Sequence, residues 1–170
     1  MDLTPYITQL KLVHVLAVFG FVLVHGASAL VALRVRRERE RTRLRALLEF
    51  SLAYQAWGWA ALLVALVSGV ASGIAGGYWT GGQLWLWASL VVFIVVSGLM
   101  TPISTGYLNE VRHAVGLATY DDTRRKLLPP PEASDEALDR ILDSRRPVVG
   151  SAVGLAGIAI LVYLMMFKPF

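Results

Sequence analysis

The sequence contains no cysteine and few charged residues, and both shortages limit what the chain can be. Without cysteine it forms no disulfide bond, no thiolate metal site and no cysteine nucleophile. Charged residues make up 16% of the chain, against about 25% in soluble domains, which is too little for a surface that faces water on all sides. No Asp or Glu lies within 50–109. This argues against a coupled ion transporter, which needs a buried acid or base in its spans.

Three long stretches carry no charged residue: 12–33, 50–109 and 147–167. A helix needs about 20 apolar residues to cross the hydrocarbon core of a bilayer, so the middle stretch holds two spans and the others hold one each. The glycine-rich segment 76–83 divides the middle stretch, because glycine opposes helix continuation. Backbone groups in lipid must be satisfied within their own segment, which makes these spans helices. The sequence predicts an all-α integral membrane four-helix bundle in one transmembrane domain (1–170), with helices at about 8–36, 47–75, 84–110 and 147–167.

The basic residues are distributed unevenly along the chain. All of them except Lys11 and Lys168 lie within 34–45 or 111–146. The positive-inside rule places these two segments in the cytoplasm, so we expect a multi-pass cell-membrane protein with both termini outside. Although the pI is near 9.7, topology accounts for the arginines. We therefore expect membrane lipids rather than nucleic acid as partners, because basic side chains attract anionic headgroups by about 1 kcal/mol each.

The arginine-rich segment 34–49 contains neither glycine nor proline. It is predicted to extend the first two helices into the cytoplasm as a hairpin with a turn near 38–42. Three pairs at i,i+4 spacing favour helix here: Arg34/Glu38, Arg36/Glu40 and Arg45/Glu49. A solvated loop that sets topology is the favoured interpretation, and a docking surface for a partner is the alternative.

The cytoplasmic segment 111–146 is the only sizeable stretch suited to water. Pro129-Pro130-Pro131 interrupts it, since proline cannot continue a helix. Beyond this break, Ser134 is a candidate N-cap for a short amphipathic helix whose apolar side comprises Leu138, Ile141 and Leu142. Such a helix is expected either to lie on the inner leaflet or to pack on the hairpin.

His14 and His25 are the residues most suggestive of chemistry. They are 11 positions apart, so on one helix they share a face to within about 20° and are about 16 Å apart along the axis. An ionisable residue within a span is a functional hypothesis by default. The two histidines could be axial ligands of b-type haem, one near each leaflet, or could bind copper, with Met100 as a partner at the depth of His25. Alternatively, they are neutral side chains hydrogen-bonded across the bundle, or parts of a proton relay.

Small residues and one proline are expected to shape helix packing. Gly69-x-x-x-Gly73 and Gly150-x-x-x-Gly154, with Gly157, allow close approach of neighbouring backbones, within or between chains. Pro102 should kink the third helix, because it removes one backbone hydrogen bond.

The segments around the two histidines carry a resemblance. Leu-Val-His-Val-Leu-Ala-Val-Phe at 12–19 and Val-His-Gly-Ala-Ser at 24–28, followed by the arginine segment, resemble a family of small bacterial four-helix integral membrane proteins, a domain of unknown function. The Gly-Gly-Tyr-Trp turn, the Thr-Pro pair and the C-terminal Met-Phe-Lys-Pro-Phe fit the same family. The first helix is more distantly similar to CopD-type and HemJ-type membrane proteins. That similarity implies copper or haem chemistry at His14 alone.

These observations leave three functional hypotheses. The lead is a non-enzymatic accessory or scaffold subunit of the bacterial inner membrane that forms a homo-oligomer or joins a larger membrane complex. No residue is singled out as catalytic. The second is a haem or copper protein using His14 and His25. The third, a small-solute transporter, depends only on Pro102 and the four spans.

Overall fold

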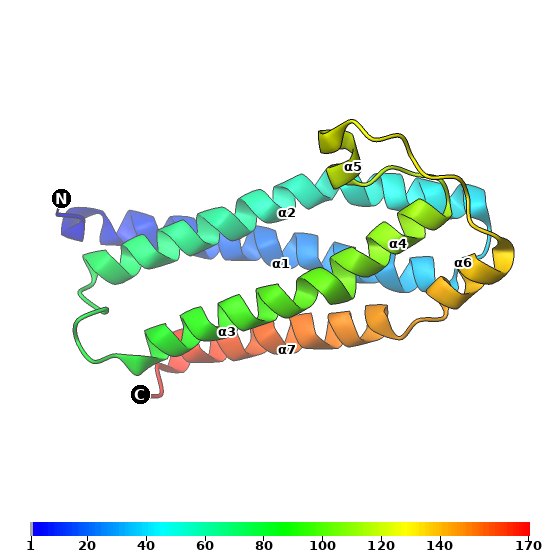
Figure 1. The fold of residues 1–170 in the computed structure, drawn as a ribbon. Coiled ribbons are helices and arrows are strands. Elements are labelled where there is room, and N and C mark those ends of the chain that lie inside the picture. The colour runs from blue at the N-terminus through cyan, green and yellow to red at the C-terminus, as the bar shows by residue number, and fades with distance from the viewer. Residues whose placement is uncertain (1) are drawn as a thin grey trace.

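The computed structural model describes residues 2–170 and is all-α, with four long helices, which confirms the predicted fold class (Figure 1). A 3-10 turn at Thr4–Tyr6 precedes the first of them. The long helices are α1 (Ile7–Arg37), α2 (Arg41–Ala75), α3 (Leu84–Met100) and α7 (Arg146–Phe167).

Shorter helical elements follow α3. A π-helical segment at Thr101–Thr105 joins α3 to α4 (Gly106–Ala114), so that the three form one long rod. Two short helices, α5 (Tyr120–Arg125) and α6 (Asp135–Leu142), then lead to α7. Ser134 caps α6 as predicted, with its hydroxyl accepting a hydrogen bond from the backbone N–H of Ala137 at 3.3 Å.

Each long helical stretch is long and apolar enough to cross a membrane: Thr4–Arg37, Arg41–Ala75, Leu84–Ala114 and Asp135–Phe167. Large apolar side chains point outward from these stretches, for example Phe19, Leu23 and Leu30 on α1. A soluble protein rarely exposes so much contiguous apolar surface, whereas acyl chains cover it in a bilayer. By length and composition, the chain is a helical multi-pass membrane protein.

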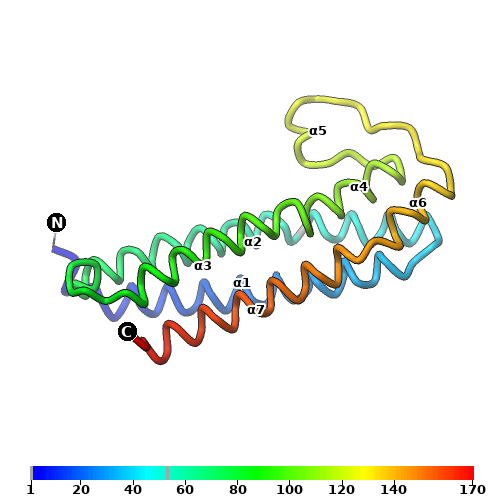
Figure 2. Tube along the Cα trace, turned by 60° about the horizontal axis from the view of Figure 1, so that its bottom comes forward, coloured from blue at the N-terminus to red at the C-terminus, as the bar shows by residue number. Residues whose placement is uncertain are grey.

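The four helices associate as two pairs. α1 packs along α2, α3 packs along α7, and contacts between α1 and α7 join the pairs. Both termini and the turn at 76–83 lie at one end of the bundle, and α5, α6 and the α1–α2 turn lie at the other (Figures 1 and 2). We call the first the terminal end. The second is the arginine-rich end, because it carries the basic residues of 34–45 and 111–146.

Helix α1 ends at Arg37 and α2 begins at Arg41, beyond the predicted membrane spans. This confirms the predicted hairpin with a turn near 38–42. A long-range contact stabilises the beginning of α2, since Leu44 and Leu48 lie one turn apart and are both fully buried at the arginine-rich end. The helical rods therefore extend through the segment that the sequence suggested was a solvated loop.

Pro102 lies in the π-helical segment, where the helix widens. Proline removes one backbone donor, and π-bulges are a common response to such local disruption. Two side chains engage carbonyls nearby: Thr101 Oγ1 donates to the Ser97 carbonyl at 3.2 Å, and Arg146 Nη2 donates to the Pro102 carbonyl at 2.8 Å. A hydrogen bond thus joins the Pro102 carbonyl to Arg146 at the beginning of α7.

The most completely buried residues form a cluster at the arginine-rich end, which we call the helix-end core. Its members come from α1, α2, α4, α6 and the chain just after α4: Val35, Leu44, Leu48, Tyr107, Val111, Ala114, Val115, Leu138 and Leu142. Full burial of a leucine side chain contributes about 1.5–3 kcal/mol, so Leu138 and Leu142 anchor α6 here. Two placements are expected for α6. In the structure α6 packs on the hairpin formed by α1 and α2.

Candidate functional site

His14 contacts α2 through a notch at Gly69. Its Nδ1 lies 2.7 Å from the carbonyl oxygen of Ala65. A Cβ atom at position 69 would lie 2.8 Å from the imidazole Cε1, so only glycine leaves room for the ring. Because a carbonyl only accepts hydrogen bonds, Nδ1 carries a proton and donates it to Ala65. This hydrogen bond and the notch at Gly69 fix the orientation of the ring.

His25 packs against α7 at a second glycine. Its Nε2 is so close to Gly154 that a Cβ at that position would overlap it, and the same Cβ would lie 2.6 Å from the imidazole Cε1. Phe21 stacks on the imidazole ring of His25, with ring centroids 5.6 Å apart and an interplanar angle of 27°. Within residues 2–170, the buried Nε2 atom has no hydrogen-bond partner.

The structure places His14 and His25 against different helices. His14 lies against α2 and His25 against α7, with about 16 Å of helix between them, so no single metal centre is held by both. Met100 ends α3, which packs on α7, the helix that His25 also contacts. His25 Nε2 is buried against Gly154. No group of three or more His, Asp or Glu suited to a metal occurs in the described chain. A separate haem or copper site at each histidine stays a prediction.

Arg112 differs from the rest of the basic segment in being buried, which its sequence position does not indicate. Its side chain is 2% exposed and donates from Nη2 to the Leu48 carbonyl and, at 2.6 Å, to Ser51 Oγ. Buried charges are normally paired with an opposite charge, but no carboxylate lies within ion-pair distance of Arg112 in the part of the chain described. No signal in the sequence separates this arginine from its solvated neighbours.

Two buried tyrosine hydroxyls lie in the same half of the bundle. Tyr54 OH is close to Ser28 of α1 and in the electrostatic field of Arg112, yet it makes no hydrogen bond among residues 2–170. Tyr107 OH, in the helix-end core, is likewise without a partner there. Buried hydroxyls of this kind usually bind an ordered water. The arrangement is polar but supplies no nucleophile paired with a base.

The arginines of 34–45 attach the segment that follows α4. Arg41 donates to Asp135 and to the Ala133 carbonyl, both at 2.7 Å, and Arg45 donates to Glu132 and, at 3.0 Å, to the Val115 carbonyl.

Two further arginines, nearer the α1–α2 turn, reach the end of α6. Arg39 pairs with Asp143 at 2.7 Å, and Arg36 donates to the Ser144 carbonyl at 2.9 Å. Of the three predicted i,i+4 pairs, only Arg34/Glu38 is found among the ion pairs of residues 2–170, at 3.9 Å. Arg36 and Arg45 bind residues that are distant in the sequence instead. The basic segment 34–45 therefore also holds the chain that follows α4 in place.

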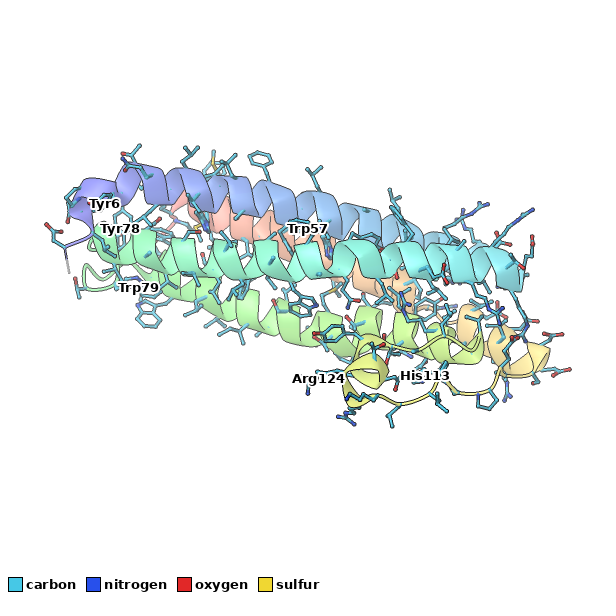
Figure 3. All side chains as sticks on the ribbon, turned by 90° about the horizontal axis from the view of Figure 1, so that it is seen from above. Tyr6, Trp57, Tyr78, Trp79, His113 and Arg124 are labelled. Atoms are coloured by element: carbon cyan, nitrogen blue, oxygen red, sulfur yellow. The ribbon has the colours of Figure 1, made fainter. Side chains whose placement is uncertain are left out.

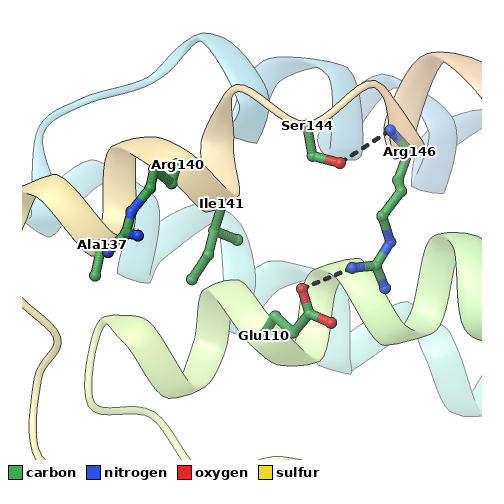
Figure 4. Close-up of a pocket in the computed structure, with 6 residues that line it drawn as sticks. All are labelled: Glu110, Ala137, Arg140, Ile141, Ser144 and Arg146. Carbon is green, nitrogen blue, oxygen red and sulfur yellow. Dashed lines mark hydrogen bonds and ion pairs between the residues drawn. The ribbon is translucent and has the colours of Figure 1, made fainter.

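A shallow hollow of about 440 Å³ lies between α4, α6 and the start of α7 (Figure 4). Arg146 crosses it to Glu110 at 2.6 Å, and the backbone N–H of Arg146 donates to Ser144 Oγ at 3.2 Å. The hollow is open to its surroundings, as is a second one of about 340 Å³ beside Phe50. Pro102 lines neither hollow.

The chain between α4 and α6 has its own local order. Thr119 caps α5 in a capping box with Asp122, whose carboxylate also accepts from Thr119 Oγ1 at 2.6 Å and contacts His113 Nε2 at 2.7 Å. Hydrogen bonds from Thr119, followed by the contact with His113, hold the pKa of Asp122 well below its usual range. A carboxylate therefore organises this loop at neutral pH.

Comparison of the chain with protein-family models, with curated proteins and with solved structures yields no match. The resemblance to small bacterial four-helix membrane proteins, and more distantly to CopD-type and HemJ-type proteins, stays a prediction that depends on the sequence around His14 and His25.

Proposed function

We propose that the chain is a non-enzymatic accessory or scaffold protein of a bacterial inner membrane. Its four spans anchor it, its arginine-rich end faces the cytoplasm, and a partner binds at that end. The partner is a second copy of the chain or a larger membrane complex. The basic residues at one end of the bundle support this orientation.

The observation that carries the proposal is the ordered surface built after α4. The helix-end core fixes α6, and Arg41 and Arg45 bind the chain on either side of Ala133. Exposed ion pairs contribute at most about 1 kcal/mol each, so the buried leucines supply most of the stability. A rigid surface of this kind is suited to binding a partner, because little conformational entropy is lost on docking.

Site-specific cross-linking tests the proposal. Photo-reactive residues at Glu136 and Arg140, both exposed on α6, are expected to capture one defined partner in intact membranes, and a probe at Leu23 is expected to capture none. Arg41→Ala should weaken the cross-links, since it releases Asp135 and Ala133, whereas Arg37→Ala should leave them unchanged. A monomer that gives no cross-link from either α6 position would refute the scaffold function.

The haem or copper hypothesis is tested by an absorption spectrum with metal analysis. Protein purified in detergent from haem-replete and copper-replete cells is expected to be colourless and metal-free, because Gly154 covers His25 Nε2. A stoichiometric Soret band that is lost in His14→Ala would overturn the scaffold proposal in favour of a haem protein.

A further inference from the structure

The basic residues at the arginine-rich end differ in their contacts. Most arginines of 34–45 bind the protein itself, as described above, whereas Arg37, Arg140 and Arg145 are exposed and make no ion pair among residues 2–170. Arg124, Arg125 and Lys126 are exposed and make no ion pair with any residue of the described chain. Three consecutive positive charges are therefore available to an external anion. They lie in the segment 119–128, which we call the α5 loop.

The α5 loop also exposes large apolar side chains. Tyr120 is 68% exposed, Leu127 55% and Leu128 89%. An exposed leucine beside lysine and arginine is the composition of a segment that lies in the interface of a bilayer, where apolar side chains meet acyl chains and basic ones meet headgroups.

The position of the α5 loop along the bundle axis is suited to contact with a membrane interface. From the end of α4, the chain turns back along the outside of the bundle instead of continuing away from it (Figures 1 and 2). Figure 3 shows Arg124 further toward the terminal end than His113, at about the level of Trp57 along the bundle axis.

The level of Trp57 is compatible in helix length with a bilayer boundary. Figure 3 shows Tyr6, Tyr78 and Trp79 at the terminal end, where they suit the opposite boundary. About 27 Å of helix separates Trp57 from Ala75 at the end of α2, close to the roughly 30 Å thickness of the hydrocarbon core. Trp57 is itself 73% exposed, as expected of an interfacial tryptophan.

The α5 loop is held in this shape before any ligand binds. The Thr119–Asp122 capping box begins it, and Lys126 ends α5 in the left-handed region (φ 56°). The backbone N–H of Leu127 then donates to the Asp122 carbonyl at 2.9 Å, which fixes the apolar residues next to the basic ones.

We propose that the α5 loop binds the leaflet at the arginine-rich end. Arg124, Arg125 and Lys126 contact anionic lipid headgroups, and Tyr120, Leu127 and Leu128 insert at the boundary with the acyl chains. The loop thereby holds the segment after α4 at a fixed depth. This inference is independent of the scaffold function, because it needs only the chain and a bilayer.

A single introduced cysteine tests the inference, since the native chain has none. Full-length Leu128→Cys carries an environment-sensitive fluorophore, and Glu136→Cys on α6 is the aqueous control. Both are reconstituted without a partner in nanodiscs of phosphatidylcholine alone or with 30% phosphatidylglycerol. With phosphatidylglycerol, we expect a blue-shifted emission at position 128 and quenching by doxyl groups placed near the headgroups. Position 136 should show neither.

Charge variants identify the residues responsible. R124Q/R125Q/K126Q should lower the preference of the loop for phosphatidylglycerol on the order of 100-fold, as three charges predict. R37Q/R140Q/R145Q, which removes three exposed arginines elsewhere at the same end, should leave it nearly unchanged. A label at 128 that stays fully aqueous in both bilayers overturns the inference. So does a label that is shielded from water yet unquenched by lipid, because it indicates a protein contact.

Discussion

His14 Nδ1 lies 2.7 Å from the Ala65 carbonyl oxygen, so a hydrogen bond joins the first two membrane helices. Interhelical hydrogen bonds in membrane proteins contribute about 0.6 kcal/mol on average and up to about 1.7. His14→Phe keeps a ring for the notch at Gly69 but loses the donor, and we expect it to lower the free energy of unfolding by an amount in that range. Unfolding by SDS titration in mixed micelles measures it. Leu16→Ala, on the outward side of α1, is the control and should have a smaller effect.

Gly154→Ala is expected to destabilise the bundle, because the added methyl group overlaps the ring of His25. Overpacking of this kind costs about 1–3 kcal/mol. Gly26→Ala is the matched control, since a Cβ at that position meets no atom within 4 Å. In a His25→Ala background, Gly154→Ala should lose most of its effect. Equal destabilisation in both backgrounds would mean that the two residues are not coupled.

Ser51 and Arg112 should be strongly coupled. Ser51 Oγ accepts a hydrogen bond from the buried guanidinium at 2.6 Å, and hydrogen bonds to charged groups contribute about 1.5–3 kcal/mol. We therefore expect Ser51→Ala to destabilise the native protein by that amount and to have little effect when Arg112 is replaced by Met. A double-mutant cycle in the same unfolding assay gives the coupling free energy. Additive effects would show that Arg112 does not depend on this hydroxyl.

Acidification should release the α5 loop. The pKa of Asp122 is depressed by its hydrogen bonds to Thr119 and its contact with His113. Its stabilising contribution is therefore complete above the ordinary carboxyl pKa of about 3.9. The contribution is lost as pH falls below that value toward the lower pKa of the folded protein. Hydrogen exchange of the Asp122 and Thr123 amides should stay slow at pH 5–7 and become faster than intrinsic rates alone predict below about pH 4.

Asp122→Asn provides the companion measurement at neutral pH. Asparagine cannot supply the same charged acceptor to Thr119 and His113, so both amides should already exchange quickly at pH 7. Glu136→Gln, an exposed acid at the start of α6, should leave their exchange unchanged. Slow exchange in Asp122→Asn would show that the loop is ordered by contacts other than the carboxylate.

The sequence predicts the four membrane helices well because charge-free length and a glycine-rich turn are local signals. Ser134 as the cap of α6 is also local, and it is confirmed. The hairpin of α1 and α2 is likewise confirmed, but the burial of Leu44 and Leu48 is missed because α4 and α6, which cover them, are distant in the sequence. Thr119 and Asp122, three residues apart, have the spacing of a capping box and could have indicated α5.

The candidate site is harder to predict than the fold. Placing His25 against Gly154 requires the register of α1 on α7, which no periodicity within either helix determines. Arg112 is similar, since its burial depends on Ser51 and Leu48 from another helix. Sequence reasoning selected the two histidines for their residue type. The sequence alone does not show which neighbouring group each imidazole nitrogen contacts.

The composition of the helix-end core has a consequence for synthesis at the ribosome. Its last member along the chain is Leu142, and none of its members belongs to α7. The core can therefore close once three helical rods and α6 have emerged, before the final span is inserted into the membrane. The chain that leads into α7 is then already held by α6 in the core. Arg146, the first residue of α7, therefore lies next to Glu110, with which it pairs.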